Sequence, residues 1–150
     1  MTRPSRRQMF ATAAGAGFAA AAGLAATAAQ AAPAAGGKTK AVFQVSDAEP
    51  GKWNLTLNNV RNAAADLGSA GCELEVVAFG PGVELLKAGS PIAARIAQAR
   101  QAGVAIVACE NTMRALQLAA ADMLPEIGFV PSGVVELMHK QREGWAYIRA

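Results

Sequence analysis

The sequence has few of the side chains that build metal sites and catalytic triads. It contains one histidine, His139, and two cysteines, Cys72 and Cys109, which stand far apart in the chain. No second histidine stands at metal-ligand spacing, and the two cysteines are too distant to chelate one ion. A serine triad would need His139, which falls on the polar face of a predicted helix instead of at a strand end. We therefore expect no metal site and no serine-hydrolase chemistry.

Nucleotide-binding motifs are also missing. The chain contains neither a Gly-x-Gly-x-x-Gly fingerprint nor a phosphate loop ending in Gly-Lys-Ser/Thr. The stretch FGPG at 79–82 is rich in glycine, but its Pro-Gly pair is typical of a turn. We expect no nucleotide, flavin or other cofactor.

The N-terminal stretch lacks acidic residues altogether. Arg3, Arg6 and Arg7 precede an apolar run rich in alanine and glycine, which ends in the small-x-small site Ala29-Gln30-Ala31. This pattern is that of an export signal removed in the mature protein. The run is too short and too rich in alanine to predict a membrane span, so we expect no stable membrane insertion.

The residues around Arg6 and Arg7, SRRQMF, resemble the twin-arginine signal. The lysine of that pattern is missing, since Ala11 stands in its place. An ordinary secretory signal with two arginines is the alternative. We predict a signal peptide over 1–31, a flexible linker over 32–39, one domain over 40–150 and a periplasmic location.

The mature chain has no net positive charge once this signal is set aside. The full sequence has 14 basic and 11 acidic residues, a net charge of +3. Removing the three signal arginines leaves 11 of each, and therefore no net charge. Nucleic-acid binding needs a basic surface, so we expect no nucleic-acid partner.

The chain that follows the predicted signal peptide alternates between short apolar runs and amphipathic stretches. Strands are predicted near 40–45, 73–80, 104–108, 127–131 and 145–149. Between them, helices are predicted over 51–67, after the Ser90-Pro91 start signal, from Asn111 or Thr112 to about Ala120, and over 132–143. A further short helix is predicted within 83–88. In the helix over 51–67, Trp53 falls on the buried face. This alternation predicts an α/β fold: a three-layer α/β/α sandwich with a mostly parallel five-stranded sheet.

In such a sheet, ligands bind beyond the carboxyl ends of the strands. The polar and glycine residues predicted at those ends are Asp47, Gly80, Gly82, Cys109, Glu110, Asn111, Thr112 and Ser132. Only Cys109 among them carries a strong nucleophile. We predict that Cys109 is catalytic and that the others line its pocket.

The surroundings of Cys109 leave two interpretations open. Free N–H groups at the start of the following helix would favour the reactive thiolate. The neighbouring Glu110 carboxylate would disfavour it unless that side chain points away. A buried cysteine that packs like a small apolar residue is the alternative.

A disulfide between the two cysteines is not expected. Cys72 comes just before a predicted strand, whereas Cys109 ends one. In a parallel sheet these are opposite edges, about 15 Å or more apart, and a disulfide needs Cα atoms within about 7 Å. Cys72 is therefore predicted to be structural.

Four stretches together resemble the DsrE/DsrF-like superfamily, in particular its small YchN-like branch. They are residues 40–68, 73–91, 103–115 and 121–149, which include the FGPG turn and the cysteine that closes the third strand before a helix. The resemblance implies a five-stranded flavodoxin-like α/β/α sandwich and a homo-oligomer, either a trimer or a hexamer.

The resemblance also implies a chemistry. Family members pass sulfur as a persulfide on a cysteine at the position of Cys109, with Asn111 and Thr112 supporting the thiolate or a bound anion. The implied partners are a sulfur donor or acceptor protein, or a small thiol. The alternative function is a non-catalytic ligand-binding or assembly protein in which Cys109 only lines the pocket.

Overall fold

A computed structural model describes residues 37–150 of the chain. The predicted signal peptide and most of the predicted linker lie outside the described residues. Five strands form one sheet, in the order β4-β3-β2-β1-β5. The strands are β1 (Thr39–Val45), β2 (Cys72–Ala78), β3 (Ala105–Cys109), β4 (Gly128–Val130) and β5 (Ala146–Arg149). Every neighbouring pair is parallel, which confirms the predicted α/β fold with a five-stranded parallel sheet.

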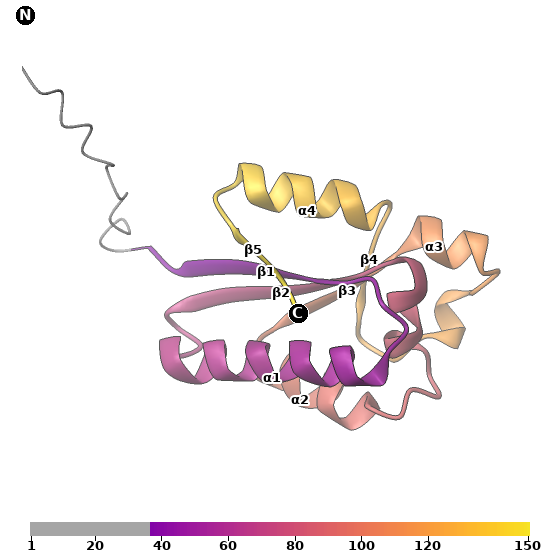
Figure 1. The fold of residues 1–150 in the computed structure, drawn as a ribbon, viewed down its shortest axis with the longest axis horizontal. Helices are drawn as coiled ribbons and strands as arrows, with labels where there is room; N and C mark the ends of the chain where they lie inside the picture. Colours follow the sequence, from indigo (N-terminus) through magenta and orange to yellow (C-terminus); the bar gives the residue numbers. More distant parts are fainter. Residues whose placement is uncertain (1–36) are drawn as a thin grey trace, which may run out of the picture. The chain divides into compact units, whose positions relative to one another are not determined.

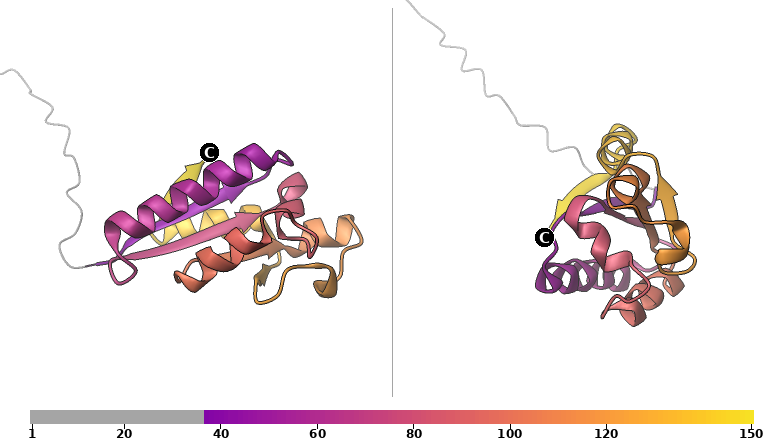
Figure 2. Two further views of the ribbon diagram at one scale, coloured as in Figure 1. Left: turned by 90° about the horizontal axis from the view of Figure 1, so that it is seen from below. Right: turned by 90° about the vertical axis from the view of Figure 1, so that its right-hand side faces the viewer.

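The helices cover both faces of this sheet. They are α1 (Pro50–Leu67), α2 (Ala93–Gln101), α3 (Glu110–Ala115) and α4 (Gly133–Arg142), with 3₁₀ turns η1 (Gly80–Leu86) and η2 (Ala120–Asp122). Helices α1 and α2 lie on one face and α4 on the other, as the end-on view in Figure 2 shows. Strands β1 to β4 follow one another across the sheet, whereas β5 returns to the far edge beside β1. Because parallel crossovers are right-handed, this reversal places α4 opposite α1 and α2.

Side-chain alternation along the strands gives the two faces different interiors. Towards α1 and α2 lies the larger apolar core, which includes Phe43, Val76 and Ile106 from three adjacent strands. Towards α4 the apolar core is small and is built mainly by Val42 and Val77 with Leu137. The same face holds Glu75, one of two buried polar side chains among the described residues.

Three details of the helices differ from the sequence-based expectations. Helix α2 begins at Ala93 instead of Pro91, because the Ser90 hydroxyl and carbonyl accept the N–H groups of Ile92 and Ala93 in a preceding turn. Helix α3 is capped by Cys109 itself instead of by Asn111 or Thr112. It also ends at Ala115 and not near Ala120.

Helix α3 stops early because the chain turns back on itself. Gln117 takes a left-handed φ of 55°, and the Leu118 N–H bonds to the Met113 carbonyl. On α4, Val134, Leu137 and Met138 have the spacing of one helical face, but this face is not buried as a whole. Only Leu137 is buried, whereas Val134 and Met138 are exposed.

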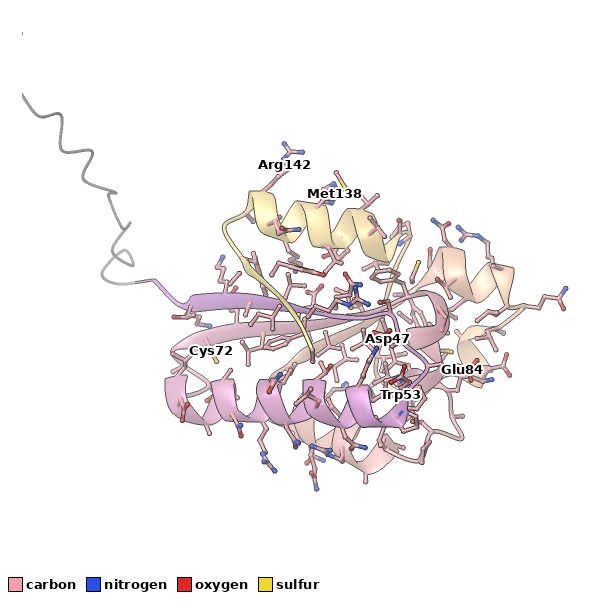
Figure 3. The ribbon with its side chains drawn as sticks, viewed as in Figure 1. Asp47, Trp53, Cys72, Glu84, Met138 and Arg142 are labelled. Carbon is pink, nitrogen blue, oxygen red and sulfur yellow. The ribbon has the colours of Figure 1, made fainter. Side chains whose placement is uncertain are left out.

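Cys72 lies at the amino end and Cys109 at the carboxyl end of the parallel strands, and both are free, as predicted. Cys72 begins β2 and lies three residues before Glu75, which pairs with Ala105 on β3. Cys109 lies four residues beyond Ala105. Seven strand positions span about 20 Å, far beyond disulfide reach. Figure 3 shows Cys72 at the end of the sheet opposite Asp47 and Glu84.

Within residues 37–150, no helix combines the length and apolar character needed to cross a bilayer.

Candidate functional site

Cys109 lies where the path of the chain over the sheet reverses. After β3 the chain enters α3, whose Met113 packs into the core on the α1 and α2 face. After β4 the chain enters α4 on the opposite face of the sheet (Figure 1). Adjacent strands whose connections diverge in this way open a crevice at their carboxyl ends, where α/β proteins bind ligands. The Asn111 N–H bonds to the Pro131 carbonyl at 3.2 Å and ties the two loops together beside this crevice.

Hydrogen-bond donors from two helix starts converge on the Cys109 sulfur. From α4 comes the backbone N–H of Gly133, and from α3 come the Thr112 hydroxyl and the Thr112 N–H. The Asn111 N–H, which also bonds to the Pro131 carbonyl, makes the smallest contribution. Burial raises the pKa of the Cys109 thiol, but these donors together outweigh burial and hold the pKa below its ordinary value. The arrangement favours the thiolate, the nucleophilic form of cysteine.

Thr112 links Cys109 to the turn that follows β2. Its Oγ1 accepts the Gly80 N–H at 2.9 Å. A hydroxyl has one hydrogen to donate, and accepting from Gly80 leaves that hydrogen available for the sulfur. Gly80, predicted as a pocket residue, therefore acts on Cys109 through Thr112.

Gly133 is the residue that sequence analysis missed. A Cβ at this position would lie 2.9 Å from Cδ1 of Phe79, so only glycine allows α4 to begin this close to the sheet. The close approach brings the first N–H of α4 to the sulfur. The Ser-Gly pair directly before an amphipathic stretch was the available signal.

The direction of the Glu110 side chain determines whether its charge opposes the Cys109 thiolate. Its carboxylate lies 3.9 Å from the Arg114 guanidinium, one helical turn further along α3, and the Glu110 and Arg114 side chains are 44% and 65% exposed. Arg114 also bonds to the Asn111 side-chain oxygen. The Glu110 charge is thus directed along the helix surface towards a cation.

A groove of about 560 Å³ lies between η1 and α3. It is lined by Gly80, Pro81, Glu84, Asn111, Thr112, Ala115 and Leu116. Asn111 and Thr112 contribute both to this groove and to the donors around the sulfur. The groove therefore offers room for a small molecule beside Asn111 and Thr112, whereas Cys109 itself does not line it and is only 4% exposed.

The other predicted site residues take different places. Gly82 lies within η1, buried against the end of β1, and does not line the groove. Ser132 caps α4, with its carbonyl accepting the Glu136 N–H at 2.9 Å. Asp47 follows β1, two strands away from β3, and its carboxylate is held by Lys52 and Arg149.

The partners of Asp47 give it a structural setting. The hydrogen bond from Lys52 is the largest influence and lowers the pKa of the Asp47 carboxyl, with partial burial opposing and Arg149 assisting. The Asp47 carbonyl also accepts the indole N–H of Trp53 at 2.6 Å. Asp47 therefore ties α1 and β5 to the end of β1.

A second cavity, of about 440 Å³, lies between α1 and α2. Its lining is mostly alanine, leucine and valine with two arginines, and it holds no cysteine, histidine or acid. Among residues 37–150, no three His, Cys, Asp or Glu side chains are grouped so as to hold a metal ion.

The sequence matches the DsrE/DsrF-like family over residues 9–150. This chain belongs to the DsrE/DsrF-like family. A comparison with curated proteins finds no match.

Solved structures agree with this assignment. The DsrE/DsrF-like chain is 36% identical to a protein of unknown function, MTH1491, from Methanobacterium thermoautotrophicum, with a TM-score of 0.72 over 75% of this chain and 100% of that one. A conserved protein of unknown function, BT1422, from Bacteroides thetaiotaomicron has 14% identity and a TM-score of 0.62 over 74% and 94% of the two chains. The ychN protein from E. coli has 17% identity and a TM-score of 0.59 over 75% and 99%. The last two likenesses show the fold alone.

The role of the Thr112 hydroxyl can be measured directly in this DsrE/DsrF-like domain. Thr112→Val removes the donor to the sulfur and the acceptor for Gly80 while keeping the side-chain shape. We expect the thiol pKa to rise and the thiolate fraction at pH 7 to fall about fivefold to tenfold, because one charge-assisted hydrogen bond is lost. Thiolate ultraviolet absorbance against pH, corrected with a Cys109→Ser variant, gives the titration. Thr112→Ser keeps the hydroxyl and should titrate like the unmodified protein; an unchanged titration in Thr112→Val would contradict this role.

Proposed function

We propose that the protein carries sulfur as a persulfide on Cys109. The observation that supports this is the convergence of two helix starts on one thiol, which lowers its pKa. A packed structural cysteine gains nothing from such donors, whereas a nucleophile does. Family membership supports the same chemistry.

The reaction has two balanced steps. The Cys109 thiolate attacks the outer sulfur of a donor persulfide, R–S–SH, so that one S–S bond forms, one breaks and R–S⁻ leaves. An acceptor thiolate then attacks the outer sulfur of the Cys109 persulfide and releases the Cys109 thiolate. The donors from Gly133 and Thr112 stabilise the sulfur anion at the start and at the end of this cycle. No cofactor enters either step.

The groove and the burial of Cys109 favour small sulfur donors. With 4% of the residue exposed, a bulky disulfide would reach the sulfur only with difficulty. A groove lined by Pro81, Ala115 and Leu116 with few charges suits an uncharged or singly charged small persulfide. Small thiols and polysulfides are therefore the proposed partners, alongside a carrier protein that can present a sulfur on a slender arm.

The test is sulfur loading followed by transfer. The protein is incubated with inorganic polysulfide, and its intact mass and cysteine-containing peptides are measured. We expect an added sulfur atom on the Cys109 peptide, which leaves again when a small acceptor thiol is added. A protein that gains no sulfur, or that gains it only on Cys72, would overturn the proposal.

A non-catalytic binding protein is the second candidate function, and one observation favours it. The low exposure of Cys109 is also what a thiol that merely lines a binding pocket would show. The sulfur-loading experiment distinguishes the sulfur carrier from the non-catalytic binding protein. A Cys109 thiol that is inert to polysulfide until the protein is unfolded would support binding without chemistry.

We also propose that the chain is exported by the twin-arginine route and acts in the periplasm. The support is the SRRQMF stretch followed by an apolar run and a small-x-small site ending at Ala31. In that location, the sulfur donor and acceptor would have to be periplasmic small molecules or exported proteins.

A homo-oligomer, trimer or hexamer, is proposed as the working state. The outer face of α4 carries Val134, Val135 and Met138, all more than two-fifths exposed. Figure 3 shows Met138 and Arg142 on the side of α4 that points away from the sheet. An apolar stripe of this kind on a helix surface is typical of a face covered by another chain.

Charge introduced on this stripe should break the assembly. We expect Met138→Glu to shift the particle mass measured by sedimentation equilibrium towards that of one chain, because a carboxylate would be buried without a partner. Leu55→Glu is the matched control, since Leu55 is similarly exposed but lies on α1 across the sheet. A monomeric unmodified protein, or an unchanged mass in Met138→Glu, would contradict the assembly through α4.

A further inference from the structure

An ion pair lies inside the domain between the sheet and α4. Glu75 Oε2, from β2, is 2.6 Å from Lys140 Nζ, and the two side chains are only 6% and 18% exposed. The same face of the sheet carries the small apolar cluster of Val42, Val77 and Leu137. Burying two charges costs about as much as their attraction returns, so such a pair is weak evidence for stability and better evidence for a specified geometry.

Further contacts fix the direction of Lys140. The Trp145 ring centroid lies 4.3 Å from Lys140 Nζ, and Glu136 Oε1 lies 3.5 Å from it. The ammonium is therefore held by a carboxylate from the sheet, a carboxylate from its own helix and an aromatic face. Because these contacts fix the Lys140 side chain on three sides, they also fix the position of α4 relative to the sheet.

The apolar contacts of α4 are too few to set its position alone. Only Gly133 and Leu137 on α4 are buried, whereas its other apolar side chains, Val134, Val135 and Met138, are exposed. One buried leucine resists lifting of the helix but resists sliding and rotation weakly, because apolar contact is not directional. A short ion pair is directional and can supply the missing restraint.

The functional end of α4 depends on that restraint. Gly133, at the start of the helix, donates its N–H to the Cys109 sulfur, and Lys140 lies seven residues further on. At 1.5 Å per residue this is about 10 Å of rigid helix, so sliding or rotation at one end is passed to the other. Glu75 sits on β2, which pairs directly with the strand that ends in Cys109. The ion pair and the Gly133 donor therefore both connect α4 to the sheet.

We propose that Glu75 and Lys140 are positioning residues for the Cys109 site: their ion pair sets the slide and rotation of α4 that place the Gly133 N–H on the sulfur. The inference rests on the proposed function only in taking the Cys109 thiolate as the working group. It assigns no chemical step to either residue.

A direct electrostatic influence of the pair on Cys109 is small. Glu75 pairs with Ala105, and Cys109 lies four positions beyond, so Glu75 and the sulfur are about 14 Å apart. That separation exceeds the Debye length of about 8 Å at physiological salt, and the pair carries no net charge. The other charges near these groups are Glu136 and Lys40 around Lys140 and Trp145, and Glu110 with Arg114 beside Cys109. A change in Cys109 titration on removing the pair must therefore travel through α4.

The decisive variant removes both charges and keeps the volume: Glu75→Leu with Lys140→Met. Apolar replacement of a buried ion pair is commonly neutral or stabilising, so the fold should survive with an unchanged urea midpoint. If the pair positions α4, the Cys109 titration still moves to higher pH, and the thiolate fraction at pH 7 falls about tenfold, as for the loss of one charge-assisted hydrogen bond. Thiolate ultraviolet absorbance, corrected with Cys109→Ser, measures this without requiring access to the sulfur.

Two controls complete the design. Lys140→Arg keeps a cation that can reach Glu75, so the Cys109 thiol of this variant should titrate as in the unmodified protein. Arg100→Met breaks a 2.6 Å ion pair with Glu126 on the α2 side of the domain and should leave the titration unchanged. A double variant that titrates like the unmodified protein would overturn the proposal, and so would a double variant that does not fold, since the pair would then serve the fold itself. Failure of sulfur loading with an upward-shifted titration in the double variant would instead overturn only the sulfur-carrier function.

Discussion

Cys109→Ser is expected to abolish sulfur loading from polysulfide and to leave the fold intact. Serine preserves the shape of the side chain and can accept the same hydrogen bonds, but its hydroxyl stays protonated at neutral pH and does not take up sulfur. The donors from Gly133 and Thr112 that stabilise a thiolate therefore have no anion to act on. Intact-mass measurement after incubation with polysulfide should show no added sulfur at this position.

Cys72→Ser is the matched control for this experiment. The Cys72 thiol donates to the Gly68 carbonyl at 3.2 Å, at the opposite edge of the sheet, and a serine hydroxyl can make the same bond. This variant should load sulfur as fully as the unmodified protein. Equal loading of Cys109→Ser and the unmodified protein would show that Cys109 is not the acceptor of sulfur.

The sheet was accessible to sequence reasoning because its strands are simple in pattern. Runs such as that of Ala41–Val45 are apolar and short, and they alternate with amphipathic helices, which is enough to predict a parallel sheet covered on both faces. Strand order was not predictable. The position of β5 beside β1 depends on which edge the last crossover reaches, and no local pattern encodes that choice.

The candidate site was predicted in outline for a related reason. Parallel strands put their carboxyl ends at one edge, so Cys109, Thr112 and Gly80 could be grouped before any contact was known. The structure joins them through the Gly80 to Thr112 hydrogen bond. Gly133 escaped prediction because its role depends on close approach to Phe79, a contact between segments more than fifty residues apart.

The outer face of α4 shows where periodicity misleads. Val134, Leu137 and Met138 have helical spacing, which suggests a single buried stripe. In the structure, Lys140 and Leu137 face the sheet and the other apolar residues face outward. A helix whose interior side carries a lysine and whose exterior carries valine and methionine cannot be oriented from hydrophobicity alone, because burial by another chain has the same pattern as burial in a core.

The second large effect is expected for stability, from Gly82→Ala. A Cβ on Gly82 would lie 2.3 Å from the carbonyl oxygen of Val45 and 2.8 Å from the Ser46 nitrogen. Both are backbone atoms, and the Val45 carbonyl already accepts the Phe79 N–H at 3.1 Å, so neither side can move without loss. We expect the free energy of unfolding in urea to fall by about 3 kcal/mol and the thermal midpoint by about 10 °C or more.

Gly89→Ala separates this clash from the general effect of replacing a glycine. A Cβ on Gly89 meets no heavy atom within 4 Å, and the φ of Gly89 lies outside the left-handed region. That variant should be as stable as the unmodified protein or slightly more so, because alanine restricts the unfolded chain. Similar stabilities for Gly82→Ala and Gly89→Ala would contradict the packing of η1 on β1.

The consequence of Gly82→Ala should also reach Cys109. Relief of the clash requires η1 to move away from β1, and η1 begins at Gly80, whose N–H bonds to Thr112. In molecules that remain folded, Thr112 would lose the partner that directs its hydroxyl at the sulfur, so the thiol pKa should rise as in Thr112→Val. A destabilised Gly82→Ala protein with an unshifted thiol titration would mean that the clash is relieved by β1 instead. The FGPG stretch would then serve the fold without serving the site.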